Sequence, residues 1–255
     1  MVAGVVNWHI GRCGSSVLGS LLAQHPSIAY SNEIYSRYMP RRRGSSSLPS
    51  IESVLDSAEQ TSVAGGLHYF EVKHLPDQNL GLYPQLEVMD WLGLFFSRGY
   101  TRHLLMSRRN GLRRIVSHLR ALRSGQYVVK NSGAVQKDSP IMVPLEGITH
   151  GFGHRTLLGW LEEYERGHRS MQNCFRAMEQ LHSGFSCLEL VYEDRIEHDP
   201  RVAYHDVCSF LELPIVNVEI RQQKINHGRL TDLISNYDDV RHCLSSTRFA
   251  WMLSE

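Results

Sequence analysis

Residues 5–33, VVNWHIGRCGSSVLGSLLAQHPSIAYSNE, decide the fold. A short apolar run leads into a Gly-Arg-Cys-Gly-Ser-Ser turn, and a segment with one apolar face follows at once. This order predicts a strand, a glycine-rich turn and a helix, which is the unit of a parallel α/β sheet. The turn lacks the lysine that follows the second glycine in nucleotide triphosphatases, because Ser15 stands there.

The same alternation continues along the chain. Apolar runs predict strands at 2–8, 27–30, 68–73, 103–106 and 186–191. Three-to-four spacing of apolar residues predicts helices at 15–23, 49–59, 85–96, 112–123, 155–182 and 203–211. We therefore expect a three-layer α/β/α fold with a mainly parallel central sheet, as a single domain over residues 1–255.

Two stretches are expected to be loops. Residues 40–47, PRRRGSSS, are basic and polar, and residues 131–154 hold two prolines and four glycines without clear periodicity. A connection of this second length is either a substrate lid or binding loop, or a plain surface insertion. The sequence leaves both readings of 131–154 open.

Composition is that of an ordinary globular protein, with 42% apolar and 21% charged residues and a net charge of +1. This balance gives no general attraction to nucleic acid or to an anionic membrane. Seven arginines and no acid nevertheless lie between positions 102 and 123. Such a local cluster suits a compact anionic ligand.

The five cysteines are scattered and contain no Cys-x-x-Cys pair, so we expect reduced thiols and no zinc site. No apolar run approaches the roughly 20 residues that a membrane-spanning helix needs. No basic-then-apolar signal region follows Met1. We expect a cytoplasmic protein without a membrane span.

The glycine-rich turn has the composition of an anion site. Gly11 and Gly14 allow close approach of the backbone, Ser15 and Ser16 offer hydroxyls, and Arg12 adds a permanent charge. The first amides of the following helix would donate to the same anion. A tight turn that only starts a helix would use the same residue types, so the turn alone does not decide between the two.

Cys13 lies inside this turn. The helix start and Arg12 would favour a reactive thiolate there. A small side chain that fits the loop is the preferred reading, because no partner pattern for a catalytic cysteine can be assigned around it.

Two motifs resemble the sulfotransferases that use 3′-phosphoadenylyl sulfate (PAPS). HIGRCGSSVLGSLLAQHP is similar to their 5′-phosphosulfate loop, and LLMSRRNGLRRIVSHLRA to their 3′-phosphate segment, where Arg109 and Ser117 hold the family spacing. The resemblance implies a P-loop-like fold and two groups of nucleotide-binding residues. These are Gly11, Arg12, Cys13, Gly14, Ser15 and Ser16, and then Arg109 and Ser117.

The spacing of the second motif agrees with a phosphate grip. Apolar residues at 112, 115, 116, 119 and 122 form one helix face that we expect to be buried, while Asn110, Arg113 and Ser117 fall on another. A solvated basic helix face is the alternative. Two anion motifs at strand ends suit a ligand with two separated anionic groups.

Weaker similarities follow in family order, in FEVKHLP, LELVYEDRIEHDPRVAYHDVCSFLELP and LTDLISNYDDVRHCLSSTRFAWML. Arg12 replaces the lysine of the cytosolic small-molecule members. Their Arg-Lys-Gly segment is missing, and Lys224 or Arg229 is a candidate substitute. The Arg-x-Gly-Ser-Ser version of the loop points toward a carbohydrate or lipid-like acceptor.

The implied reaction is in-line transfer of a sulfuryl group from PAPS to a hydroxyl, which leaves 3′,5′-bisphosphoadenosine. Arg12 would stabilise the leaving phosphate. The base is Glu33, which would need a pKa raised by burial, or His74, and Lys73 is a partner for the sulfonate or the base. No metal is expected, because His150 and His154 are accompanied by no carboxylate motif.

Two other functions stay open. A P-loop kinase or nucleotide hydrolase would need a lysine at the position of Ser15 and an acidic, magnesium-binding strand end. A pseudoenzyme would bind the nucleotide without transferring anything, and the missing Arg-Lys-Gly segment keeps this alternative. The sequence does not give the acceptor or the oligomeric state.

Overall fold

The computed structural model describes residues 4–45, 47–60, 66–74, 80–130, 139–150, 153–223 and 228–254. The chain divides into two compact units. Unit 1 comprises Met1–Ser107 with Gly167–Glu219, and unit 2 comprises Arg108–Arg166 with Ile220–Glu255. A single domain over the whole chain stays a prediction.

Unit 1 is built on a five-stranded sheet in the order β2-β3-β1-β4-β8, and all its neighbouring strands are parallel. The strands are β1 (Gly4–His9), β2 (Ile28–Glu33), β3 (Leu67–Lys73), β4 (Arg102–Ser107) and β8 (Ser186–Val191). The five predicted strands are all present, with ends that shift by up to three residues.

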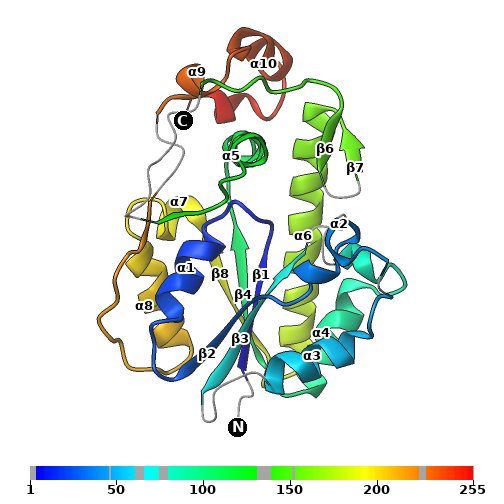
Figure 1. Ribbon diagram of the computed structural model, residues 1–255, viewed down its shortest axis with the longest axis vertical. Helices are drawn as coiled ribbons and strands as arrows, with labels where there is room; N and C mark the ends of the chain where they lie inside the picture. Colours follow the sequence, from blue (N-terminus) through cyan, green and yellow to red (C-terminus); the bar gives the residue numbers. More distant parts are fainter. Residues whose placement is uncertain are drawn as a thin grey trace. The chain divides into compact units, whose positions relative to one another are not determined.

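Helices cover both faces of the sheet, as Figure 1 shows. On one face lie α1 (Ser15–Leu22) and α8 (Pro200–Phe210), and on the other α3 (Ile51–Gln60) and α4 (Val88–Ser97). The short elements of this unit are η1 (Ser36–Tyr38), α2 (Pro40–Arg43), η2 (Leu80–Leu82) and α7 (Tyr192–Arg195). The predicted three-layer α/β/α fold is confirmed.

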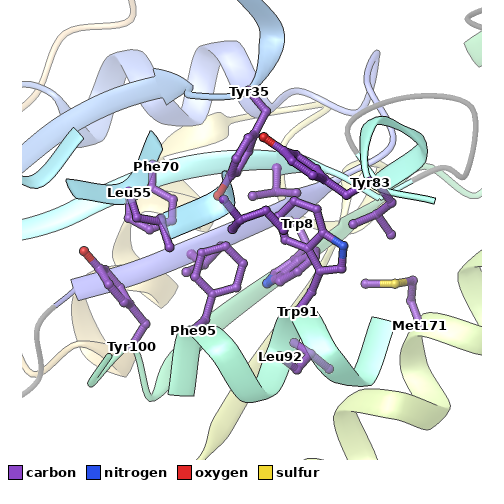
Figure 2. Packing of buried hydrophobic residues seen from close by; sticks show 14 of the residues in the cluster. Trp8, Tyr35, Leu55, Phe70, Tyr83, Trp91, Leu92, Phe95, Tyr100 and Met171 are labelled. Atoms are coloured by element: carbon purple, nitrogen blue, oxygen red, sulfur yellow. The ribbon is translucent and has the colours of Figure 1, made fainter. Parts of the chain in front are cut away.

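The core between the sheet and α3 and α4 is aromatic (Figure 2). Trp8 of β1 meets Phe95 of α4 edge-on at a centroid distance of 5.5 Å, and Tyr35 meets Trp91 in the same way at 5.2 Å. All four rings are fully buried. Edge-to-face rings of this size bury much apolar area and fix the position of α4 on the sheet.

On the other face, α1 lies unusually close to the sheet at Gly19. A Cβ atom on Gly19 would lie 2.5 Å from the hydroxyl of Tyr30 and 2.9 Å from Oε1 of Glu71. Real Cβ atoms do not approach other atoms so closely. Only glycine therefore lets α1 pack at this distance from β2 and β3.

Unit 2 contains α5 (Gly111–Ser124), α9 (Leu230–Leu233), α10 (Tyr237–Leu244) and η3 (Ala250–Leu253). Two small antiparallel pairs join β5 (Val129–Lys130) to β9 (Gln222–Gln223) and β6 (Ile148–His150) to β7 (Gly153–Arg155). Helix α6 (Leu157–Leu181) begins in unit 2 and ends in unit 1. Among the described residues, no helix combines the length and apolar character that crossing a membrane requires.

Several local expectations were wrong. The loop predicted at 40–47 begins with the short helix α2, because Pro40 occupies a first helical position where its missing N–H costs nothing. Leu122, expected on the buried face of α5, is 44% exposed. The described parts of 131–154 include β6 and β7, and 131–138 and 151–152 lie outside the described residues.

The packing of Gly19 can be tested with Gly19→Ala. Alanine normally stabilises a helix interior by about 1 kcal/mol over glycine, but overpacking at Tyr30 and Glu71 costs about 1–3 kcal/mol. We expect a net loss of unfolding free energy in urea titrations. Gly93→Ala in α4 is the control, since no atom lies within 4 Å of the position that its Cβ would take, and it should be stabilising. Equal effects of both changes would contradict the close approach.

His103 gives a pH-dependent prediction. Its Nδ1 accepts from Nε1 of Trp8 at 3.0 Å, and its Nε2 lies 2.9 Å from the carbonyl of Tyr100. Burial lowers the pKa of His103 to about 3, against a small opposing effect of that carbonyl. Below pH 6.5 the unfolded chain therefore binds a proton that the folded chain does not, and stability falls as the pH falls.

His103→Gln removes this proton. Between pH 6.5 and 5, the wild-type protein should lose about 2 kcal/mol more unfolding free energy than the variant, at about 1.4 kcal/mol per pH unit. Urea midpoints measured across this range provide the check. Parallel pH profiles of the two proteins would contradict a neutral buried His103.

Candidate functional site

The glycine-rich turn leaves β1 in a left-handed backbone conformation. The φ angles are 73° at Gly11, 59° at Arg12 and 85° at Gly14. Glycine adopts this region freely, whereas Arg12 is held there at a cost of about 1 kcal/mol. Gly14 is the N-cap of α1, and it has no side chain that could cap the helix. Helix amino termini of this kind present backbone amide donors outward.

Close neighbours explain the glycine at position 14, whereas the positive φ angle explains the one at position 11. A Cβ on Gly14 would lie 2.7 Å from Ile196 and 3.2 Å from the ring of Tyr192. A Cβ on Gly11 would lie 3.7 Å from Cε of Lys73, so the lysine stem runs along the turn. Of the other predicted loop residues, Cys13 and Ser15 are buried, Arg12 is half-buried and Ser16 is exposed.

The carboxyl ends of β1, β2 and β3 bring the predicted catalytic residues together. Parallel pairing sets His9 opposite Lys73 and Glu33 opposite Glu71. Nζ of Lys73 lies 3.0 Å from Oε1 of Glu33, with both side chains partly buried. Two residues predicted from the sequence, the base and its cationic partner, thus form an ion pair beside the turn.

This ion pair decides the protonation of Glu33. Burial acts to raise the pKa of Glu33, but the charge of Lys73 outweighs burial and holds the pKa below its ordinary value. From its sequence, Glu33 was expected to need a pKa raised by burial in order to act as the base. Its pKa is instead lowered. Glu33 is a carboxylate at neutral pH and can accept a proton without first losing one.

Beneath this pair lies a buried contact between His9 and Glu71. Nε2 of His9 is 3.2 Å from Oε2 of Glu71, and both side chains are 1% exposed. Nδ1 of His9 accepts from the backbone N–H of Gly11 at 3.1 Å. Burial acts to lower the pKa of His9, and contacts with Cys13 and Glu71 act to raise it. The amide of Gly11 needs the lone pair of Nδ1, so this hydrogen bond fixes the ring in its neutral form.

Glu71 is held from its other side by tyrosines. The hydroxyls of Tyr30 and Tyr69 donate to Oε1 at 3.4 and 3.5 Å, and their rings stack at a centroid distance of 5.4 Å. Nδ2 of Asn7 donates to the hydroxyl of Tyr69 at 2.7 Å. The carboxylate is therefore fixed by groups from β1, β2 and β3.

His9, Glu33 and Glu71 each offer one ligand atom, and these atoms lie within 4.8 Å of one another. The donor set fits a metal poorly. Because Nδ1 of His9 accepts the Gly11 amide, its proton is on Nε2, the atom that would have to bind the metal. Glu33 is already neutralised by Lys73. Both carboxylates thus already have partners, Lys73 for Glu33 and His9 for Glu71.

His74, the alternative base, follows β3 directly. Its backbone N–H donates to the carbonyl of His9 at 3.1 Å, and its side chain is 2% exposed. Its ring stacks on that of His168 from α6, with centroids 5.9 Å apart and planes at 29°. Burial lowers the pKa of His168, although the charge of Glu189 acts to raise it. Nothing in the sequence indicated that His168 lies beside His74.

In unit 2, the chain that begins α5 is fixed by several hydrogen bonds. The hydroxyl of Tyr164 accepts from the N–H of Arg108 at 3.1 Å and donates to its carbonyl at 2.5 Å. Oδ1 of Asn110 accepts from the N–H of Arg113 at 2.9 Å, and its Nδ2 donates to the carbonyl of Met252 at 3.1 Å. Asn110 is thus the N-cap of α5.

The expected phosphate residues of this motif differ in burial. Ser117 is 4% exposed, whereas Arg109 is exposed. Several of the clustered arginines have structural partners within their own unit, among them Arg102, Arg113, Arg114 and Arg123. Binding of a compact anion by this cluster stays a prediction. Arg229 and Lys224 are the candidate substitutes for the missing Arg-Lys-Gly segment. Arg229 is exposed at the start of α9, and Lys224 lies outside the described residues.

The sequence reasoning missed His9 and Glu71. A signal for Glu71 exists, because it is a single carboxylate inside the buried run of β3, between Phe70 and Val72. Buried carboxylates need a paired group. The residue at the end of the neighbouring strand, His9, is the natural candidate. Recognising the pair required knowing that β1 and β3 are neighbours.

The Glu33–Lys73 pair can be tested directly. In Lys73→Met, the carboxylate loses the cation that lowers its pKa while burial remains, so the pKa of Glu33 should rise. Carbon-detected NMR titration of the Glu33 carboxyl group measures the change. Arg201→Met, which breaks an exposed pair with Asp199, is the control and should leave Glu33 unchanged. An unchanged Glu33 pKa in Lys73→Met would refute the assignment.

No family model and no curated protein sequence matches the chain. Solved structures do resemble it. A sulfotransferase from Alicyclobacillus acidocaldarius has 14% identity and a TM-score of 0.44, over 97% of this chain and 93% of that one. The sulfotransferase domain of the Synechococcus PCC 7002 olefin synthase has 13% identity and a TM-score of 0.42, over 99% and 86%. The sulfotransferase domain from the curacin biosynthetic pathway has 12% identity and a TM-score of 0.38, over 85% of this chain and 76% of that one.

Proposed function

We propose that the protein is a sulfotransferase that moves the sulfuryl group of PAPS to a hydroxyl group. One observation carries the proposal. Lys73 runs along Gly11 of the anion-type turn and ends on Glu33, so turn, cation and carboxylate form one continuous set. A group held by the turn would therefore lie beside both a positive charge and a base.

The turn would bind the 5′-phosphosulfate. Gly11 and Gly14 expose the backbone, Ser15 and Ser16 begin the helix without a side-chain cap, and Arg12 brings a charge that is never lost. As the bond from sulfur to the 5′-phosphate breaks, negative charge grows on the leaving oxygen. Donors fixed around that oxygen stabilise the transition state more than the ground state.

Glu33 would act as the base. The acceptor hydroxyl oxygen forms a bond to sulfur, its proton passes to the Glu33 carboxylate, and 3′,5′-bisphosphoadenosine leaves. When Lys73 turns toward the sulfonyl oxygens, Glu33 loses its cationic neighbour and its pKa rises, which makes it a better base. His74 is the second candidate, but its buried ring packs against His168.

Arg109 and Ser117 would bind the 3′-phosphate. They lie in unit 2, at the start of α5 and two turns along it. An exposed guanidinium forms bidentate bonds with phosphate, and a serine hydroxyl adds a single one. The acceptor is proposed to be a carbohydrate or a lipid-like alcohol, from the Arg-x-Gly-Ser-Ser form of the loop, and the protein to be cytoplasmic.

Ligand class is tested first, by thermal-shift titration with 3′,5′-bisphosphoadenosine and separately with ATP and magnesium. The bisphosphate should raise the melting temperature with saturation, since a ligand that binds only the folded state stabilises it. Stabilisation by ATP with magnesium alone would instead support a kinase or nucleotide hydrolase. Binding of the bisphosphate without transfer to any member of a hydroxyl acceptor library would indicate a pseudoenzyme.

Two substitutions distinguish the proposed base from the proposed phosphate-binding residue. Glu33→Gln should lower turnover by about 10²- to 10⁴-fold with little change in nucleotide affinity, because it removes the base. Arg109→Ala should weaken bisphosphate binding by about tenfold or more, because a charged hydrogen bond is lost. Glu52→Gln and Arg123→Ala are matched surface controls. If Glu33→Gln kept full turnover, His74 would be assigned as the base instead.

A further inference from the structure

Each ring nitrogen of His9 lies close to one polar group. Nδ1 accepts from the N–H of Gly11 at 3.1 Å, and Nε2 faces Oε2 of Glu71 at 3.2 Å. In a neutral imidazole one nitrogen donates and the other accepts, whereas a protonated imidazole has no lone pair for the amide of Gly11. Glu71 is therefore the group that places the proton on Nε2 and leaves the lone pair of Nδ1 for Gly11.

The Gly11 bond lies at the start of the left-handed segment. Gly11 and Arg12 both have positive φ angles, and Arg12 is one of two non-glycine residues among the described ones with that property. A backbone in this region relaxes unless its surroundings hold it. The amide of Gly11 is fixed by a ring that is 1% exposed and cannot move away. The strain at Arg12 is thereby retained in the absence of a ligand.

We propose that His9 and Glu71 are positioning residues that hold the Gly11–Arg12 backbone in its anion-binding conformation. Glu71 sets the tautomer of His9, and His9 fixes the amide of Gly11. Arg12 and the start of α1 are then aligned before the anion arrives. A preorganised loop binds more tightly because it loses less conformational entropy when the ligand binds. Neither residue touches the anion.

His25 provides a natural control. Its Nδ1 accepts from the backbone N–H two residues on, that of Ser27, at 3.1 Å, and its Nε2 lies 2.9 Å from the carbonyl of Pro214. It is 2% exposed. The local geometry and burial thus match those of His9, but His25 follows the carboxyl end of α1, away from the turn. A general structural role of such a histidine would appear equally at both positions.

The first experiment needs no ligand. In the wild-type protein, nitrogen NMR of the imidazoles should show His9 Nδ1 without a proton and Nε2 with one, and the Gly11 amide should be protected from hydrogen exchange. His9→Phe should accelerate exchange at Gly11. His9→Asn should keep the protection, because Asn Oδ1 takes the place of Nδ1. A protonated Nδ1 in the wild type, or equal exchange in both variants, would overturn the proposal.

The second experiment rests on the proposed function and measures affinity for 3′,5′-bisphosphoadenosine. We expect His9→Phe to weaken binding by about fivefold to tenfold, the effect of one hydrogen bond, and His9→Asn to remain near wild type. His25→Phe and His25→Asn should not alter affinity. A purely structural role predicts that the smaller asparagine is as harmful as phenylalanine, and that the His25 variants weaken binding equally.

The two experiments fail separately. If the wild-type protein binds no bisphosphate, the proposed function is wrong, while the exchange and tautomer measurements still decide whether His9 fixes the turn. If the bisphosphate binds and every His9 variant binds it equally well, the positioning role is wrong and the proposed function stands. If His9→Phe does not fold, the wild-type tautomer and the His9→Asn exchange decide the outcome.

Discussion

Two carboxylates, Glu33 and Glu71, are forced together by the pairing of β2 with β3, and their repulsion must be balanced within a partly buried space. The chain balances it with one partner on each side. Lys73 neutralises Glu33 near the surface, and Nε2 of His9 faces Glu71 beneath it. Like charges so near each other are not stable without such partners. The positions of all four residues, and of the turn next to them, depend on this balance.

The arrangement separates two tasks. The outer pair, Lys73 and Glu33, is partly exposed and can change partners when a substrate arrives. The inner pair, His9 and Glu71, is closed off by Tyr30 and Tyr69 and can only keep its neighbours in place. In the proposed function, the outer pair would take part in the chemistry and the inner pair would support it. Substitutions in the two pairs are then expected to differ in their effects on kinetics and stability.

The sequence predicted the larger features because they rest on local patterns. Strand and helix positions, the three-layer fold, and the meeting of Glu33 and Lys73 with the turn follow from periodicity and from parallel strands ending at one edge. The lowered pKa of Glu33 was missed because the balance between burial and the charge of Lys73 depends on side-chain packing, which sequence spacing does not give. His9 and Glu71 were missed for the same reason, since strand order is set by tertiary packing and not by spacing. The packing of Arg114 against Trp160 and Tyr164 was likewise missed, because it depends on tertiary contacts.

The close approach of α1 at Gly19 links positions that are far apart in the sequence. Since Gly19 lies against both the hydroxyl of Tyr30 and the carboxylate of Glu71, a larger residue at 19 is compatible only with a smaller one at 30. Phenylalanine at 30 would not make enough room, because Cε2 of the ring lies 2.7 Å from the position of that Cβ, and it would also remove one of the two hydroxyls that hold Glu71. Positions 19, 30 and 71 are therefore expected to vary together among related chains, so that sequence covariation at this helix would report on the support of the turn.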